Sequence, residues 1–368
     1  MRQRKVEIPH LMHVAPGCLD DLPRLLAGFP TGRVLVGSGD GPSVAFADGV
    51  AGSLVRSGVD VIREAGLRGS LDQAADLAAV AIKEQVTLMI AVGGGRVIDT
   101  VKLAAARTRT PFVSAPTTLS HDGISSPVAS LVPEEGFRQS FGAAMPAAVV
   151  IDLEVISSAP ARTLRAGAGD LVSNLTALLD WQLADVQGEA SYDAFAAMIA
   201  ESASRPLLQI DDLTDPQSLE TVAKGLLQSG LAMAAAGTSR PCSGAEHLIS
   251  HSLDSRLGDR SAMHGEQVAL GTLFSAAAHD SHLLEPLHDL YGRIGLPRTP
   301  ADLGLSDEDL ERAILAAPSA RRDRFTILTE LMADSGTRVA DVFARAYHPD
   351  RSRHQIRHVG DQTVDAQA

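Results

Sequence analysis

Residues 87–102 read TLMIAVGGGRVIDTVK: an apolar run meets three glycines and continues into a helical pattern. The run from Thr87 to Val92 is typical of a fully buried strand. The three glycines let the backbone turn tightly and approach a phosphate, and a helix beginning near Val97 would offer unpaired N–H groups to it. The spacing matches neither of the common nucleotide-binding motifs. The residues alone therefore predict a strand–turn–helix unit that is either a pyrophosphate site or a plain tight turn.

Short strands and amphipathic helices alternate on both sides of this unit, up to about residue 160. We expect further strands at 33–36, 59–62, 112–114 and 149–151, and helices at 43–57 and 71–84. Such alternation indicates a parallel sheet, which binds ligands beyond the carboxyl ends of its strands. From residue 161 onward helical patterns dominate. We predict a Rossmann-like α/β domain over 1–160 and an all-α domain over 161–368.

Composition excludes several classes of protein. The chain has 368 residues, of which 45% are hydrophobic, too many for a disordered chain. Its net charge of -13 argues against a nucleic-acid-binding protein, and no apolar run is long enough to span a membrane. It has two cysteines, too few for a disulfide framework, and its basic start has no apolar segment after it. We therefore expect a cytoplasmic protein.

The first expected strand ends in the turn GSGDGP, residues 37–42. Its acidic residue, Asp40, is a candidate partner for the ribose hydroxyl of an adenine dinucleotide. The alternative is an ordinary solvated turn residue.

Histidines at helical spacing suggest a metal site in the second half. A helix is expected to begin near Gly244, and it carries His247 and His251 four residues apart, on one face. A third histidine, His264, opens another helix, and Asp170 is expected to end a Gly-Ala-Gly loop at the start of a helix. Two or three imidazoles and one carboxylate suit a catalytic Zn²⁺ or another divalent cation. The spacing alone does not choose between His247 and His251.

The segment SHDGISSP, residues 120–127, resembles the signature of sn-glycerol-1-phosphate dehydrogenases, members of the iron-containing (group III) alcohol dehydrogenase superfamily with the dehydroquinate synthase-like fold. Four further segments, 93–99, 166–174, 244–251 and 264–268, are similar to the family's other motifs and follow in the same order. Together the segments lie within about residues 30 to 330.

The resemblance implies a role for each matching position. Asp170, His247 and His264 would bind the metal, and Asp122 and His251 would be catalytic and face the substrate, which Asp170 would also border. The residues implied to line the dinucleotide are Gly93, Gly94, Gly95, Arg96, Val97, Ile98, Asp99, Thr117, Thr118, Leu119, Ser120 and Ser126. Asp40 departs from the family's usual turn. It would repel a 2′-phosphate and so favour NAD over NADP.

The implied activity is the reversible reduction of dihydroxyacetone phosphate to sn-glycerol 1-phosphate by NAD(P)H. The implied metal is Zn²⁺, with Ni²⁺ or Fe²⁺ as alternatives, and a homo-oligomer is expected. Alternatives are a glycerol or other polyol dehydrogenase, a dehydrogenase of another phosphorylated ketone, and a binding protein without catalysis. A sugar-phosphate cyclase is less favoured, because such sites use several lysines and this chain has four. For the same reason, the substrate's phosphate would be held by Arg, His, backbone N–H groups or Lys102.

Overall fold

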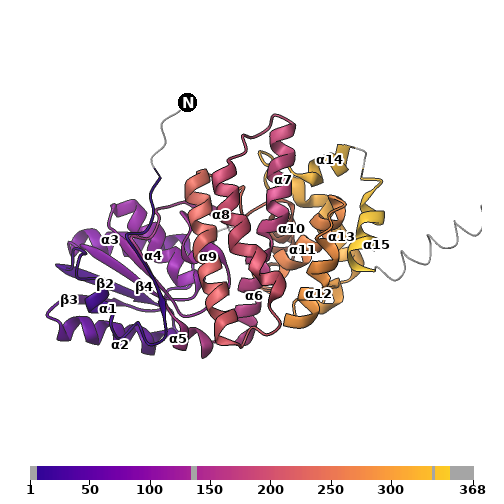
Figure 1. The fold of residues 1–368 in the computed structure, drawn as a ribbon. Helices are drawn as coiled ribbons and strands as arrows, with labels where there is room; N and C mark the ends of the chain where they lie inside the picture. The colour runs from indigo at the N-terminus through magenta and orange to yellow at the C-terminus, as the bar shows by residue number, and fades with distance from the viewer. Residues whose placement is uncertain (1–5, 134–138, 334–335, 349–368) are drawn as a thin grey trace, which may run out of the picture.

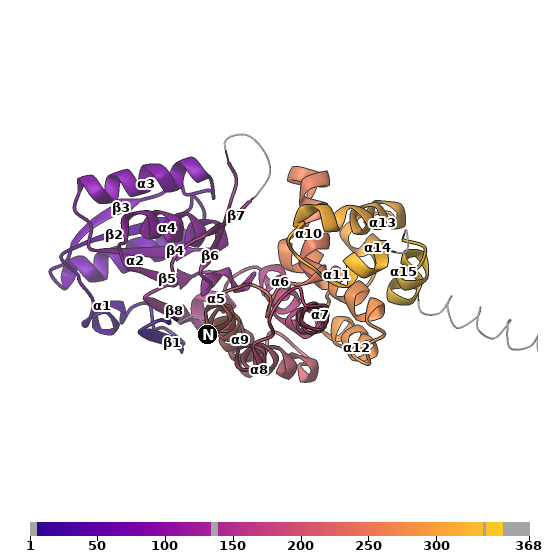
Figure 2. The same ribbon diagram turned by 90° about the horizontal axis from the view of Figure 1, so that it is seen from above.

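A computed structural model describes residues 6–133, 139–333 and 336–348 of the chain. Figure 1 and Figure 2 show two parts, a sheet flanked by helices and a part built from helices alone. Six parallel strands with helices on both faces precede the part built from helices alone, as the sequence predicts. The predicted fold class is confirmed, whereas the exact boundary at residue 160, immediately before α6 (Ala161–Val172), stays a prediction.

The main sheet has six parallel strands in the order β1-β8-β5-β4-β2-β3. The direction in which the chain adds strands reverses between the neighbouring strands β2 and β4. From β2 the chain continues to β3 at one edge of the sheet, whereas from β4 it continues to β5 on the opposite side. The carboxyl ends of β2 and β4 therefore flank a topological switch point, where open α/β sheets bind their ligands.

The strands of the described chain are β1 (Leu11–Ala15), β2 (Arg33–Ser38), β3 (Asp60–Glu64), β4 (Leu88–Gly93), β5 (Phe112–Pro116), β6 (Val128–Leu131), β7 (Gln139–Gly142) and β8 (Ala148–Asp152). The α-helices are α1 (Leu22–Leu25), α2 (Ser43–Arg56), α3 (Leu71–Lys83), α4 (Gly95–Thr108), α5 (Leu153–Ser157), α6 (Ala161–Val172), α7 (Asn174–Val186), α8 (Ala194–Ser204), α9 (Pro216–Ala236), α10 (Ala245–Leu257), α11 (His264–Ala278), α12 (Leu284–Ile294), α13 (Asp307–Ala316), α14 (Ile327–Ala333) and α15 (Val339–Tyr347).

Strand β4 shows why the sheet is buried on both faces. Its side chains alternate, so Met89 and Ala91 pack with the face covered by α3 and α4. Leu88, Ile90 and Val92 pack with the opposite face, against α1 and α2. All six residues of β4 are buried, as the continuous apolar run predicts.

Three strands of the structure were not expected from the sequence. β1 forms one edge of the sheet and pairs with β8, a strand from the other end of the α/β part. β6 and β7 form a separate antiparallel pair, which projects beside the sheet in Figure 2.

The expected loop before Asp170 is wrong: Gly167, Gly169 and Asp170 all lie inside α6. The glycines serve close helix packing rather than a turn. A Cβ at Gly169 would stand 2.4 Å from the carbonyl oxygen of Gly265 on α11, and one at Gly167 would stand 2.4 Å from that of Leu119. Glycine is a poor helix former, so the Gly-Ala-Gly segment predicts a loop when it is judged from the local sequence. In the structure, close packing against other segments requires these small residues inside a helix.

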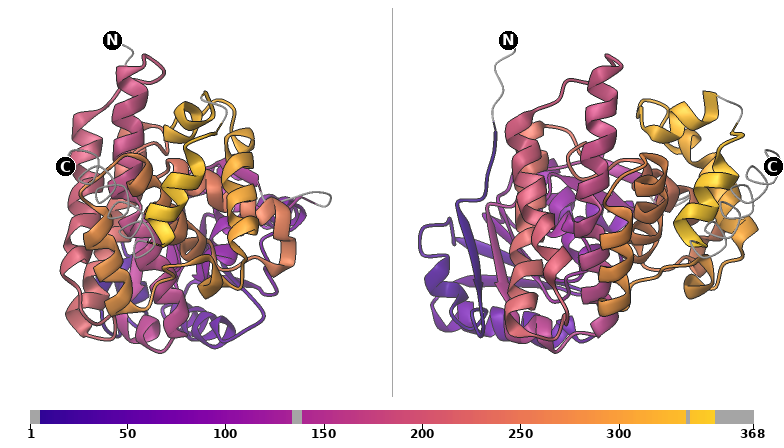
Figure 3. Two further views of the ribbon diagram at one scale, coloured as in Figure 1. Left: turned by 90° about the vertical axis from the view of Figure 1, so that its right-hand side faces the viewer. Right: turned by 45° about the vertical axis from the view of Figure 1, so that its right-hand side comes forward.

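Helices alone form the second part, which Figure 3 shows from the side away from the sheet. Within the described residues, none of these helices has the length and apolar character needed to cross a membrane. One apolar cluster runs from the α3/α4 face of the sheet into this part, through residues such as Leu171 of α6 and Leu270 of α11. This shared core fixes the helices that carry the candidate site against the carboxyl ends of the strands.

Candidate metal and dinucleotide site

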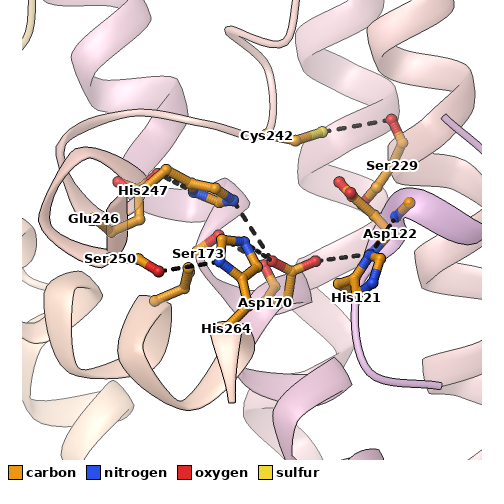
Figure 4. A network of polar contacts seen from close by, with 12 residues as sticks. His121, Asp122, Asp170, Ser173, Ser229, Cys242, Glu246, His247, Ser250 and His264 are labelled. Atoms are coloured by element: carbon orange, nitrogen blue, oxygen red, sulfur yellow. Dashed lines mark hydrogen bonds and ion pairs between the residues drawn. The ribbon is translucent and has the colours of Figure 1, made fainter. Parts of the chain in front are cut away.

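Three side chains from three helices converge on one point. Asp170 lies near the end of α6, His247 in the first turn of α10, and His264 is the first residue of α11. The Nε2 atoms of both histidines lie 3.5 Å from Oδ1 of Asp170, and Figure 4 shows both rings turned toward this carboxylate. One potential ligand atom from each of the three residues lies within 4.8 Å of those of the other two. The structure therefore brings together the three residues that the resemblance implies as ligands.

The spacing fits a divalent cation better than a set of hydrogen bonds. Oδ1 of Asp170 is buried and has no hydrogen-bond partner among the described residues, and 3.5 Å is too long for a normal N–H···O bond. A tetrahedral ion with bonds of about 2.0–2.1 Å holds its ligand atoms about 3.4 Å apart. Two imidazoles and a carboxylate are a ligand set that suits Zn²⁺ and related metals, leaving a position for substrate.

Neighbouring polar groups fix the orientation of both imidazoles. Nδ1 of His247 lies 3.0 Å from Oε1 of Glu246, and Nδ1 of His264 lies 3.0 Å from the hydroxyl of Ser250. Ser250 donates in turn to Oε1 of Gln267, so its oxygen accepts from His264. Each Nδ1 is thus placed to donate, which leaves the Nε2 lone pair for a metal.

The sequence alone does not assign a supporting role to Glu246, Ser250 or Gln267. The available signal is their position: Glu246 adjoins His247, while Ser250 and Gln267 each stand three residues after a histidine of the site, on the same helix face.

Burial and charge perturb the protonation of the cluster. Burial alone would lower the pKa of His247, but the neighbouring carboxylates of Asp170 and Glu246 raise it to about 10. Burial lowers the pKa of His264 well below its usual value. Burial, with the charge of Asp170 added, raises the pKa of Asp122 to about 8. The site therefore gathers titratable groups whose pKa values are shifted in opposite directions, which is typical of catalytic centres.

Asp122 connects the cluster to the α/β part. It begins the short 3₁₀ helix η1 (Asp122–Ile124), and its backbone N–H donates to Oδ2 of Asp170 over 2.8 Å. The ring centroid of His251 lies 6.1 Å from that of His264, one turn along α10 from His247. Both residues expected to face the substrate thus border the cluster.

The glycine turn lies at the end of β4, with Gly94 capping α4. Other side chains approach these glycines closely: a Cβ at Gly94 would stand 2.9 Å from the hydroxyl of Thr118, and one at Gly95 would stand 2.0 Å from Nε2 of His121. His121 was not singled out from the sequence. Its Nδ1 accepts from the backbone of Gly123, so a neutral ring carries its proton on Nε2, which faces the turn.

Other residues implied for the dinucleotide lie near this turn. Thr117 donates its backbone N–H to the carbonyl of Gly93, and Ser126 is buried with its hydroxyl 3.3 Å from the carbonyl of Val128. Arg96 is exposed on the first turn of α4. The remaining implied residues with side chains are buried or half-buried around the turn: Val97, Ile98, Thr118, Leu119 and Ser120.

Lys102 does not serve as a clamp for a substrate phosphate. Its ammonium is completely buried and donates to Oδ1 of Asp99 and to the carbonyls of Gly123 and Val128. Asp99 also accepts from the backbone of Ser130 through Oδ2. The Lys102–Asp99 pair thus holds α4 against the segment that follows Asp122. Because its ammonium is already bonded inside the protein, Lys102 is excluded as a residue that binds the substrate's phosphate.

Asp40 stands at the carboxyl end of β2 and forms an ion pair with Arg68, with Nε 2.8 Å from Oδ2. Both side chains are more than half exposed. Asp40 is therefore an exposed carboxylate that is paired with an arginine, rather than a turn residue in contact with solvent alone.

Residues 13–160 match the family model of iron-containing alcohol dehydrogenases. Relatives named glycerol-1-phosphate dehydrogenase (NAD(P)+) include that of Methanosarcina mazei, 40% identical over 264 residues that cover 71% of this chain and 73% of the relative. Another is that of Pyrobaculum aerophilum, 36% identical over 330 residues that cover 88% of this chain and 92% of the relative.

Solved structures share the fold. A probable glycerol dehydrogenase from Sinorhizobium meliloti superposes with a TM-score of 0.76 at 24% identity, covering 95% of this chain and all of that one (100%). The glycerol dehydrogenase of Schizosaccharomyces pombe gives 0.74 at 21% identity, covering 98% of this chain and 94% of that one. At such identities the likeness shows the fold alone.

Proposed function

Since this chain belongs to the glycerol-1-phosphate dehydrogenase family of iron-containing alcohol dehydrogenases, we propose that it reduces dihydroxyacetone phosphate reversibly to sn-glycerol 1-phosphate with NAD(P)H. The observation that carries the proposal is the convergence of Asp170, His247 and His264 near the glycine turn of β4 and α4. His121 lies between the two, because its ring centroid is 6.3 Å from that of His264 and its Nε2 would stand 2.0 Å from a Cβ at Gly95. A hydride donor and a carbonyl activator are the two parts that such a reduction needs.

The metal would be held by Asp170, His247 and His264, and we propose Zn²⁺, with Ni²⁺ or Fe²⁺ as alternatives. When bound, it would supply Lewis-acid polarisation of the ketone, as the nicotinamide would supply hydride. Asp170 contributes Oδ1, because Oδ2 already accepts from the backbone of Asp122. Glu246 and Ser250 hold the two rings in place through Nδ1.

The other residues of the chain bind and orient the reactants. The backbone of Gly93 to Asp99 would receive the pyrophosphate, where the start of α4 presents unpaired N–H groups. The segment 117–120 and Ser126 would lie along the dinucleotide. Asp122 would orient a substrate hydroxyl, and His251 would pass a proton between the substrate and solvent. Expectations of a homo-oligomer and of a cytoplasmic location stay predictions.

The test is oxidation of NADH and NADPH by the purified full-length chain reloaded with Zn²⁺ or Ni²⁺. Dihydroxyacetone phosphate is compared with dihydroxyacetone, and glycerol is tested in the reverse direction. We expect turnover with the phosphate ester and formation of the sn-1 product. Equal or better turnover with the unphosphorylated compounds would indicate a polyol dehydrogenase. Formation of sn-glycerol 3-phosphate, or no turnover of the phosphate ester, would contradict the proposal.

A further inference from the structure

The imidazole of His121 lies in a slot between two glycines. A Cβ at Gly95 would stand 2.0 Å from its Nε2, and a Cβ at Gly123 would stand 2.5 Å from its Nδ1 and Cε1. A side chain at either glycine would therefore force the ring to move. Figure 4 shows the ring on the Asp122 side of the candidate metal cluster. The backbone on both sides of His121 is thus shaped to hold its ring in one place.

The backbone also decides which ring nitrogen of His121 can donate a hydrogen bond. Nδ1 accepts the backbone N–H of Gly123 over 3.0 Å and so caps the start of η1. A ring nitrogen that accepts a hydrogen bond carries no proton, so the proton of the ring is on Nε2. Among the described residues, none accepts a hydrogen bond from Nε2. His121 therefore presents a fixed donor to a ligand that binds at the glycine turn where α4 begins.

The same ring borders the candidate metal cluster. Its centroid lies 6.3 Å from that of His264, and the two rings are nearly perpendicular, at 89°. His121 is therefore the neighbour of both parts of the proposed site, the turn for the pyrophosphate and the cluster for the metal. Because the nicotinamide must reach a ketone at the metal, the nicotinamide half of the cofactor has to lie on this side of the turn.

We propose that Nε2 of His121 donates a hydrogen bond to the phosphate of the nicotinamide half, and that this contact directs the nicotinamide toward the metal cluster. The inference rests on the dinucleotide site of the proposed function and adds one side chain to it. The first turn of α4 offers backbone N–H groups to the same pyrophosphate. A hydrogen bond from the imidazole to a charged phosphate oxygen is stronger than one between neutral groups.

Two substitutions separate the donor of His121 from its capping role. In His121→Asn, the amide oxygen can replace Nδ1 as the cap of η1, but no donor reaches the glycine turn. In His121→Gln, the amide nitrogen can replace Nε2 as the donor, but the acceptor for Gly123 is lost. A role confined to capping makes Gln the more damaging substitution for ligand binding. The proposed contact makes Asn the more damaging one.

The test measures dissociation constants of ADP-ribose and 5′-AMP by calorimetry, with the full-length chain loaded with Zn²⁺ and without any ketone. ADP-ribose carries both phosphates of the pyrophosphate, whereas 5′-AMP carries only that of the adenosine half. His121→Asn should weaken ADP-ribose binding at least about tenfold, the loss expected for one hydrogen bond to a charged group, and change 5′-AMP binding less than about threefold. His121→Gln should bind both ligands within about threefold of the wild type.

His13→Asn is the matched control. His13 is half-buried on β1, at the edge of the sheet, and its substitution should change neither constant. Unchanged ADP-ribose binding in His121→Asn, or equal weakening of both ligands, would overturn the inference. Thermal unfolding shows whether each variant is folded. Should His121→Asn not fold, His121→Gln decides alone, since tight ADP-ribose binding supports the contact and lost binding overturns it.

The wild type distinguishes a failure of this inference from a failure of the proposed function. If it binds neither ADP-ribose nor NADH, the inference fails together with the dinucleotide site. If it binds both but does not reduce dihydroxyacetone phosphate, only the proposed substrate is wrong. In that case the comparison of His121→Asn with His121→Gln still decides the role of His121.

Discussion

Replacing Gly265 by alanine should distort the metal site by forcing apart two helices that carry proposed ligands, although no proposed ligand is itself substituted. Gly265 follows His264 on α11, and a Cβ added to it would stand 1.8 Å from the carbonyl oxygen of Ala166 on α6. Ordinary contact begins at 3.4 Å, so α6 and α11 would have to separate by about 1.6 Å. The same two helices carry the proposed ligands Asp170 and His264, and Oδ1 of Asp170 lies 3.5 Å from Nε2 of His264.

A displacement of that size is comparable with the length of a metal–ligand bond. We expect Gly265→Ala to lower metal affinity by at least about 10- to 100-fold, the usual effect of disturbing the surroundings of a ligand. Overpacking should also lower the free energy of unfolding by about 1–3 kcal/mol. Competition with a chelating indicator gives the affinity, and thermal unfolding with excess chelator gives the stability without the metal's contribution.

Gly49→Ala is the control for the loss of a helical glycine. Gly49 lies in α2, and nothing stands within 4 Å of the position of an added Cβ. This variant should keep its metal and gain up to about 1 kcal/mol of stability, since alanine is the better helix former. Wild-type metal affinity and an unchanged unfolding midpoint in Gly265→Ala would refute the claim that the contact of α6 with α11 sets the ligand spacing.

Three further experiments test other parts of the structure. Lys102→Met should cost about 3–5 kcal/mol of unfolding free energy in a denaturant titration, because Asp99 would remain buried without its cation; a change below about 1 kcal/mol would show that the pair is dispensable. His247→Ala should abolish metal retention in dialysed protein, whereas His251→Ala should keep the metal and slow turnover; loss of metal from His251→Ala would make it a ligand. Burial, with the charge of Asp152 added, raises the pKa of Cys18 to about 11. At pH 8 its thiolate fraction is thus about 10⁻³, and peptide mapping after alkylation should find Cys18 unlabelled until the protein unfolds or the pH approaches 11. Rapid labelling of the native protein at pH 8 would contradict the burial.

The local patterns of the α/β part were sufficient to predict much of its sheet. The run before Gly93 and the β-branched runs of β2, β5 and β8 are buried strands because the sheet is covered on both faces. β1 was missed because its short sequence has no clear alternation, and its place depends on β8, far along the chain. The pairing of β6 with β7 was missed for a similar reason, since neither strand has a strong pattern of its own.

The site shows the same division between local and long-range information. The histidine spacing on α10 is local, so it could be read directly, whereas the choice of His247 over His251 as a ligand came only from the resemblance. The helical setting of Asp170 could not be predicted, because it depends on contacts of Gly169 with a helix that begins almost a hundred residues later. The hydrogen bonds of Glu246 and Ser250 depend equally on tertiary geometry.

The hydrogen bond from the backbone of Asp122 to Oδ2 of Asp170 joins the proposed dinucleotide-binding segment to a proposed metal ligand, and would therefore link the two binding events. Asp122 stands at the end of the segment proposed to lie along the dinucleotide, and Asp170 supplies a proposed metal ligand. A dinucleotide that orders this segment also restrains the carboxylate, and linkage is reciprocal, so each ligand must change the affinity of the other by the same factor. If both ligands bind as proposed, the affinity for the metal would depend on the dinucleotide concentration, and the affinity for the dinucleotide on the metal concentration.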